Sequence, residues 1–411
     1  MRDLLVLFFT IGSSYFGVFR PWIGVLALAV LGYMNPHRYA WGFTKDMPIY
    51  FIVFMATAFG MITTRDKQAF PLTRETFLFI VLLTWFTLTT YLMPDFPEPA
   101  KTQWIKVMKI YIGIFPAFLL INTPYKLKML VLTIALSFGL IGLKGGIFAF
   151  GSGFSQRVYG PSNTFYYDNN HIALALNMTL PLLFLIAQQA EKKHLKWLFY
   201  AIFFFSICSV VSSWSRGGFL TLIAVTIGLL YRSRKKWLIV PLVAIGVAVA
   251  IPNLPEGWLD RMGSIQSYEE DGSAMGRFEA WDYGWHRALQ APLTGGGFET
   301  FQGHIRAVHS AYFGILGEHG FIALGLWMFL LFGTMLMLSG LRKQALMVPG
   351  MEWVKPYAEA IQISLGAYAV GGAFLTAQYW DFFYQLVAIC ALMKLFLFRE
   401  MFNQRKMKKA K

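Results

Sequence analysis

Uninterrupted apolar runs recur along almost the whole chain, and each is close to the length that an α-helix needs to cross a membrane. About 20 helical residues span roughly 30 Å of hydrocarbon. Of the 411 residues, 56% are hydrophobic and 14% are charged, whereas charged residues make up about 25% of ordinary soluble domains. Because no single soluble core can bury this much apolar surface, the sequence predicts an all-α, polytopic helical membrane protein.

Charged residues, prolines and glycines delimit the candidate spans. They fall at 3–19, 21–35, 48–64, 74–93, 104–122, 127–149, 171–190, 195–212, 217–232, 236–252, 320–341, 357–378 and 382–398. The sequence contains no internal repeat or low-complexity tract, so residues 1–411 are expected to form one membrane domain. If the first two runs both cross, the N-terminus lies outside, and if they form one span plus a re-entrant piece, it lies inside.

The formal net charge of +15 does not indicate nucleic acid, because the lysines and arginines lie mostly in short connections between apolar runs. Cytoplasmic loops of membrane proteins carry an excess of these residues. The basic segments expected in the cytoplasm are 126–128, 192–196, 232–236, 342–343 and 399–411. Alternation from them places 94–103, 150–170, 213–216 and 253–319 on the periplasmic side.

The segment 253–319 is a large periplasmic loop by this reasoning. Its first part, 253–306, carries eight acidic residues and four arginines, unlike the rest of this basic chain. Pro255, Pro292 and the run 295–297 of three glycines break it into short helices. Its tryptophans favour an ordered lid over the membrane.

Three ionisable residues on the outer side are the main candidates for chemistry. Arg216 lies in a connection too short to be a solvated loop, where its planar fork of donors can bind an anion. The alternative is an arginine that only anchors helix ends at the interface.

Arg277 precedes an aromatic helical pattern and is, taken alone, more often a surface ion-pair partner. His309 opens a polar helix start, and its imidazole is suited to proton abstraction near neutral pH. Its alternative role is a histidine that bonds to the backbone at a helix start.

Metal, cofactor and thiol chemistry are not indicated by the sequence. No H-x-x-H, H-E-x-x-H or D-x-D spacing occurs in an expected outer loop, so we expect no metal and no cofactor. The two cysteines, Cys208 and Cys390, lie in different apolar runs. A transporter would carry ionisable residues at the centres of its spans, and these centres are nearly free of them.

Several short motifs together resemble the O-antigen ligase and polymerase superfamily, and within it the O-glycosylation ligases of exosortase-type systems. They are Arg20-Pro21 with 33–38, Lys144-Gly-Gly146, 157–161, Asp168-Asn-Asn170 with 173–177, Ser215-Arg-Gly217, Gly276-Arg277 with Trp281, 292–297, His309-Ser310 and Glu318-His-Gly320. Family proteins commonly have His-Asn at the position of His309-Ser310, a departure that leaves the imidazole in place.

The resemblance implies about twelve transmembrane helices, with both chain ends cytoplasmic and the active site periplasmic in a bacterial inner membrane. It further implies metal-independent, inverting transfer of a glycan from undecaprenyl diphosphate to a sugar hydroxyl of lipid A-core, among membrane lipids. His309 would act as the base and Arg216 and Arg277 would bind the diphosphate. Accessory candidates are Lys144, Arg157, Asn170 and Glu318. An O-antigen polymerase with a second lipid-linked glycan as acceptor, or a non-enzymatic glycolipid transporter, are the alternatives.

Overall fold

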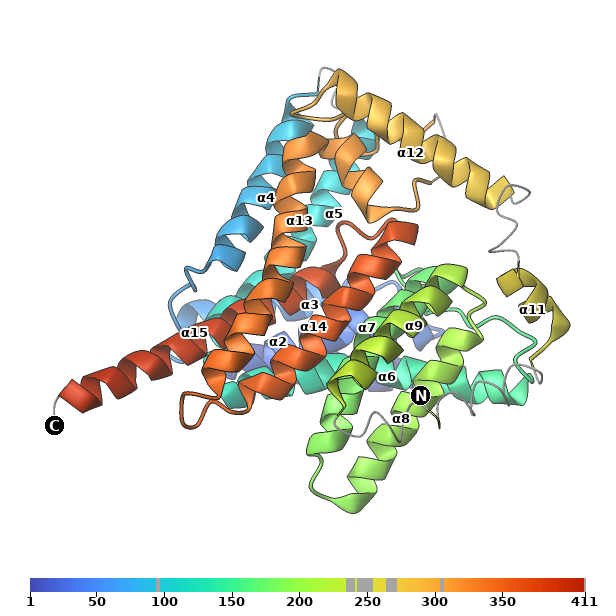
Figure 1. Ribbon diagram of the computed structural model, residues 1–411. Coiled ribbons are helices and arrows are strands. Elements are labelled where there is room, and N and C mark those ends of the chain that lie inside the picture. The colour runs from blue at the N-terminus through green and yellow to red at the C-terminus, as the bar shows by residue number, and fades with distance from the viewer. Residues whose placement is uncertain (94–96, 234–240, 242–253, 264–271, 304–306, 410–411) are drawn as a thin grey trace.

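The computed structural model describes the chain except residues 94–96, 234–240, 242–253, 264–271, 304–306 and 410–411 (Figure 1). Within the described residues the regular structure is entirely helical. The long helices are α1 Arg2–Phe19, α2 Pro21–Ala29 with a π-turn over Val30–Met34, α3 Ile49–Thr63, α4 Arg74–Tyr91, α5 Glu98–Leu120, α6 Pro124–Gly151, α7 Asn169–Gln189, α8 Lys193–Val211, α9 Arg216–Arg232, α13 Ala311–Ala345, α14 Val354–Gly371 and α15 Asp381–Lys409. The prediction of an all-helical protein is confirmed.

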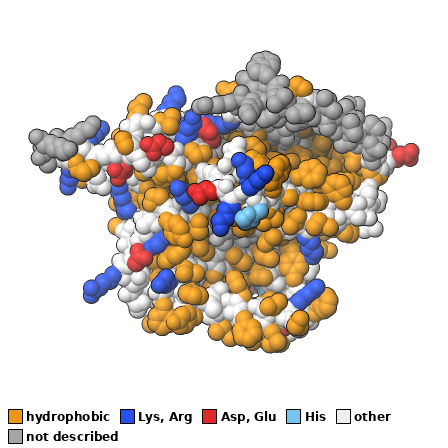
Figure 2. All heavy atoms as spheres, turned by 90° about the horizontal axis from the view of Figure 1, so that it is seen from below, with side chains coloured by type: hydrophobic (Ala, Val, Ile, Leu, Met, Phe, Trp, Pro, Cys, Tyr) orange, Lys and Arg blue, Asp and Glu red, His pale blue; other side chains and the backbone are white. Residues whose placement is uncertain are grey.

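The protein is a multi-pass membrane protein. By length and composition, seven of the described helices can cross a membrane, namely α1, α5, α6, α7, α8, α13 and α15. Two shorter apolar helices, Pro21–Met34 and Ile49–Thr63, lie among them. In Figure 2 hydrophobic side chains gather on the right and lower parts of the face, as expected for a surface in contact with lipid tails, whereas charged side chains are spread over its left and centre. Each expected span on described residues coincides with a helix, whereas 236–252 lies outside the described residues, and the total of twelve stays a prediction.

The two ends of the chain lie at opposite ends of α6. Near its start, Lys126 pairs with Asp66 at 2.8 Å, and the neighbouring Gln68 accepts a hydrogen bond from Arg399. Lys144 lies about 27 Å further along the helix at 1.5 Å per residue. There its ammonium is 4.5 Å from the centre of the Tyr39 ring, and the Tyr39 carbonyl accepts a hydrogen bond from Arg2. This arrangement, in which α1 and α2 form an antiparallel pair of helices, differs from the expectation that both chain ends are cytoplasmic, and the side of the membrane that each end faces stays a prediction.

The expected outer loop contains α11 Glu256–Gly263 and α12 Gly272–Gln290. In Figure 1, α12 lies across the outer end of α13, while α11 lies near the α8–α9 end of the bundle. Helix α13 is not continuous, because Gly320 has φ 76° and ψ −175° and separates a short helical segment, 311–319, from the long apolar one. The short segment is the last part of the loop 253–319 that the sequence predicts.

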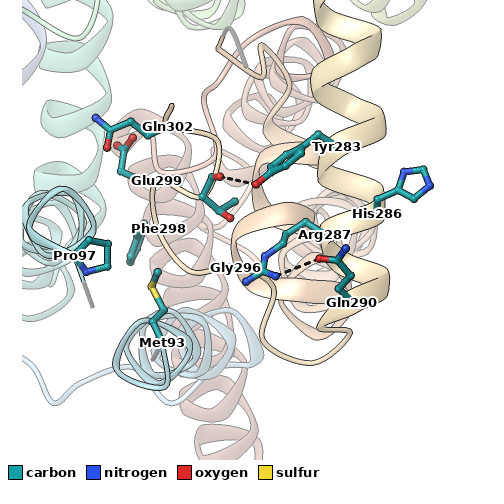
Figure 3. Close-up of a pocket in the computed structure, with 11 residues that line it drawn as sticks. Met93, Pro97, Tyr283, His286, Arg287, Gln290, Gly296, Phe298, Glu299 and Gln302 are labelled. Carbon is teal, nitrogen blue, oxygen red and sulfur yellow. Dashed lines mark hydrogen bonds between the residues drawn. The ribbon is translucent and has the colours of Figure 1, made fainter. Parts of the chain in front are cut away.

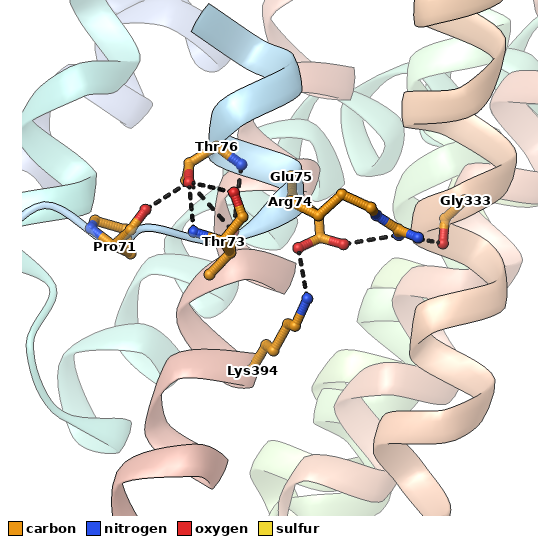
Figure 4. Close-up of polar contacts among 7 residues, drawn as sticks. All are labelled: Pro71, Thr73, Arg74, Glu75, Thr76, Gly333 and Lys394. Carbon is orange, nitrogen blue, oxygen red and sulfur yellow. Dashed lines mark hydrogen bonds and ion pairs between the residues drawn. The ribbon is translucent and has the colours of Figure 1, made fainter.

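A buried ion-pair network joins α4, α13 and α15 at the other end of the bundle (Figure 4). The Glu75 carboxylate is fully buried and lies 2.8 Å from Arg74 and 3.1 Å from Lys394. Arg74 also donates to the Gly333 carbonyl at 2.7 Å. Two cations around one buried acid satisfy its charge, so this network fixes the positions of three helices.

Candidate active site

The start of α7 forms one side of a polar cluster at the outer end of the bundle. Asp168 caps this helix, since its carboxylate accepts from the backbone N–H groups of Asn170 and His171 at 2.8 and 3.3 Å. The same oxygen lies 3.2 Å from Nδ1 of His171. Burial acts to raise the pKa of Asp168, but the hydrogen bonds from His171 and Asn170 outweigh it and lower the pKa. Asp168 is therefore a permanent negative charge beside His171 at neutral pH.

The tight turn between α8 and α9 holds Arg216 against this cluster. Ser215 caps α9 by accepting from the Gly218 backbone at 3.0 Å, and its own hydroxyl donates to Asn170 at 2.7 Å. Asn169 donates to the Ser213 carbonyl at 2.7 Å. Arg216 is the first residue of α9, so it lies at the helix N-terminus, where backbone N–H groups favour an anion.

His309 lies just before the short helical segment of α13, not within it. The helix is capped by Ser310, while His309 has φ 43°, an uncommon conformation for a residue with a side chain. Its backbone N–H donates to the Thr376 hydroxyl at 3.0 Å. Within the described part of the chain, its buried Nδ1 has no hydrogen-bond partner. The alternative role for His309 was a ring that bonds to the backbone at a helix start, and Nδ1 makes no such bond within the described residues.

Helix α12 brings Arg277 to His309. Trp281, one turn further along α12, donates to the Val308 carbonyl at 2.9 Å and stacks on Phe313 with ring centres 5.2 Å apart. These contacts fix α12 on the segment that carries His309. Burial lowers the pKa of His309, and the charges of Arg277 and His171 lower it further, whereas Asp168 acts in the opposite direction. The imidazole is consequently neutral at neutral pH and able to accept a proton.

The connection 372–380 contacts both halves of the cluster. Thr376 bonds to His309, and the Phe374 side chain lies 3.2 Å from the place where a Cβ on Gly217 would be. The sequence of this connection contains no motif that predicts contacts with the cluster. These contacts depend on α14, which returns the chain to the outer end of the bundle.

The accessory candidates are distributed differently. Asn170 lies in the cluster through its bond to Ser215, and Arg157 lies next to it, with its guanidinium 5.4 Å from the centre of the Trp214 ring. Lys144 instead faces Tyr39 on another side of α6. Glu318 is buried beneath the loop that carries the three glycines 295–297, here called the glycine-rich loop. Its carboxylate accepts a hydrogen bond from the backbone N–H of Glu299 at 3.1 Å. The structure therefore does not bring Lys144 or Glu318 to Arg216.

Glu318 belongs to a second polar network that the sequence did not reveal. Its carboxylate accepts from Tyr379 at 2.6 Å and from Gln378 at 3.2 Å. The neighbouring His319 is fully buried, with its two ring nitrogens 2.6 Å from the Tyr379 and Thr89 hydroxyls. His319 is buried because the break at Gly320 turns the short segment inward. The network supports the lid from below.

The cluster combines two arginines, a neutral imidazole and a fixed carboxylate at the end of the bundle that carries α12. Such a set can hold an anionic leaving group and accept a proton from a hydroxyl. Among the described residues, no group of three His, Cys, Asp or Glu side chains is arranged to hold a metal ion.

Comparison with known families divides the chain into two parts. Residues 1–191 match a family of unknown function. Residues 201–328, which contain Arg216, Arg277 and His309, match the family described as O-antigen ligase. A search of curated proteins found no match to the chain.

Proposed function

We propose that the chain, whose residues 201–328 match the O-antigen ligase family, transfers a glycan from undecaprenyl diphosphate to a sugar hydroxyl of lipid A-core. The reaction takes place at the periplasmic face of the bacterial inner membrane. The observation that carries the proposal is the half-buried imidazole of His309, whose Nδ1 has no partner among the described residues and whose pKa is lowered by burial and by Arg277, within the matched region.

The proposed reaction is one displacement. The acceptor oxygen attacks the anomeric carbon, the bond from that carbon to the diphosphate oxygen breaks, and the acceptor proton passes to His309. Undecaprenyl diphosphate leaves with the bonding electron pair, and Arg216 and Arg277 stabilise its added charge. A single displacement inverts the configuration at the anomeric carbon. Fixed arginines do here what a divalent cation does in many glycosyltransferases, so we propose that no metal is needed.

We also propose that the chain acts as a single membrane domain with 253–319 as its lid. One hydrophobic cluster contains buried residues from α2 through α15, including residues from both matched regions. A core shared in this way favours one folding unit over two independent ones.

The test is transfer by the purified protein from a lipid diphosphate-linked glycan to lipid A-core, with a second lipid-linked glycan as the rival acceptor.

Arg216→Lys keeps the charge but loses the paired donors of the planar fork. We expect this variant to insert normally and to bind the donor at least about tenfold more weakly. Wild-type donor affinity and turnover in Arg216→Lys would return Arg216 to an anchoring role. Transfer only to the second lipid-linked glycan would identify a polymerase, and activity abolished by a chelator would contradict the role of the arginines.

A further inference from the structure

A cavity of about 420 Å³ lies beside α12 (Figure 3), and Arg277 is not among the residues that line it. It is bounded by α12, by the glycine-rich loop with the residues that follow it, and by the residues after α4. The residues that line it are Met93, Pro97, Tyr283, His286, Arg287, Gln290, Gly296, Phe298, Glu299, Thr300 and Gln302. None of them is part of the cluster around His309.

The wall of the cavity is built by close backbone approaches. A Cβ on Gly296 would lie 2.6 Å from Nε of Arg287, and a Cβ on Gly297 would lie 1.9 Å from the Met93 sulfur. The backbone N–H groups of these glycines donate to the carbonyls of Gly317 and Glu318 at 2.8 and 2.7 Å. The loop therefore rests on the short segment of α13 and has no room for larger residues.

Glu299 is held in a strained conformation at this wall. Its φ is 62°, and the buried Glu318 carboxylate accepts its backbone N–H. Such conformations are uncommon for a residue with a side chain and persist where the surroundings enforce them. The buried Glu318 network thus fixes the backbone from which the Glu299 side chain reaches the cavity.

The lining favours one class of ligand. Arg287 only donates hydrogen bonds, Glu299 only accepts them, and the amides of Gln290 and Gln302 do both. Within the described residues, Arg287 makes no ion pair, and its side-chain hydrogen bond is to Gln290 at 3.4 Å. Met93, Pro97 and Phe298 add apolar surface. A lipid tail would leave the polar groups unsatisfied, and Glu299 would repel a diphosphate. A sugar ring, with hydroxyls that donate and accept and with an apolar face, fits all of them.

We propose that this cavity is a sugar-binding subsite that holds one residue of a glycan away from the reacting centre. The proposal rests on the proposed function and extends it. Arg277 and Arg287 lie on different faces of α12, about 15 Å apart along its axis at 1.5 Å per residue. One rigid helix therefore links the diphosphate end of the donor to the subsite. Binding energy from a remote sugar then serves to position the reacting groups.

The test measures binding of two lipid-free probes to the full-length protein in detergent: the core oligosaccharide of the acceptor and the glycan released from the donor. Arg287→Met keeps the aliphatic length without the donors, and Glu299→Gln removes the negative charge. We expect both variants to bind one of the two probes about tenfold more weakly or worse, since each loses a charge-assisted hydrogen bond. The probe that loses affinity identifies which glycan occupies the cavity.

Matched controls separate the cavity from general charge and from misfolding. Lys101→Met removes a cation from the start of α5, and Asp260→Asn removes an exposed acid from α11, and neither residue lines the cavity. Both controls should bind the probes as wild type does, and all four variants should keep the wild-type thermal midpoint and affinity for the lipid diphosphate donor. Unchanged binding in both cavity variants, equal weakening in the controls, or no binding of either probe by wild type would overturn the subsite. Wild-type protein that binds a probe but transfers nothing would instead count against the proposed function alone.

Discussion

The chemistry of His309 depends on the charges that surround one imidazole. Burial and Arg277 keep its pKa below the ordinary value of 6.5, so it is ready to accept a proton at neutral pH. Among the described residues its Nδ1 has no protein partner, in contrast to His319, whose two ring nitrogens are both bonded. We therefore propose separate tasks for the two histidines: reaction for His309 and support of the backbone for His319.

Replacing His309 with alanine should separate catalysis from binding. A positioned general base contributes roughly 10²–10⁴-fold in rate, so His309→Ala should lose turnover by about this factor. Donor binding should remain, because the arginines hold the diphosphate, and insertion should be normal, because the apolar part of α13 beyond Gly320 drives it. Turnover and donor affinity are measured on the same purified variant. Near-normal turnover would exclude His309 as the base.

The pH dependence of the same residue gives a second prediction. Activity through a neutral base is lost as pH falls through its pKa, so kcat/KM should decline on the acid side with a midpoint below 6.5. Arg277 lowers this pKa and Asp168 raises it. The acid midpoint should therefore rise in Arg277→Ala and fall in Asp168→Asn. Shifts of the same sign in both variants, or no shift in either, would show that another group controls the profile.

At the scale of elements, the break in α13 determines how the lid meets the bundle. Gly320 has φ 76°, and a Cβ there would lie 2.6 Å from the Pro292 carbonyl oxygen. That carbonyl accepts from the Phe321 backbone at 2.9 Å. The break thus joins the start of the glycine-rich loop to the start of the long helix.

Gly320→Ala should consequently lower the thermal midpoint and reduce transfer, because alanine at positive φ is strained and also clashes with Pro292. Gly325 is the matched control, since a Cβ there has no heavy atom within 4 Å. Gly325→Ala should be neutral or slightly stabilising in thermal unfolding, as expected for glycine in a helix interior. Equal midpoints for the two variants would show that the bend at Gly320 is not required.

The sequence predicted the helices better than it predicted the contacts between them. Apolar runs bounded by charges located the helices, because length and hydropathy are local properties. They also placed Arg216 in the tight connection between two helices, and the structure makes it the first residue of α9. Tertiary packing decides the rest: Lys144 faces Tyr39 because α1 and α2 pack beside α6, and His319 is buried because a single glycine bends the chain. The cavity beside Arg287 combines residues from α4, α12 and the glycine-rich loop, and no local pattern joins them.

At the scale of the whole molecule, the orientation decides whether the site faces the periplasm. The basic ends of α9 and α13 meet at Glu359 of α14, which lies 3.3 Å from Arg232 and 3.8 Å from Arg342. Lys126 and the basic C-terminal part of α15 lie at the same end of the bundle. Lysines and arginines gather on the cytoplasmic side of membrane proteins. The cluster around His309 is at the opposite end, together with Arg2.

Single cysteines and reporter fusions can test this orientation directly. Both native cysteines are buried, so an introduced, exposed cysteine should dominate labelling by a membrane-impermeant maleimide. Trp41 is 83% exposed and lies beside Arg2, and Lys192 is exposed in the connection from α7 to α8. In spheroplasts we expect Trp41→Cys to be labelled and Lys192→Cys to react only after lysis. A reporter after Gly272 should read periplasmic and one after Lys409 cytoplasmic. The reverse pattern would turn the site toward the cytoplasm and contradict the proposed transfer. If only Trp41→Cys is protected and the other three results are as expected, the first two helices form a re-entrant arrangement and the rest of the orientation stands.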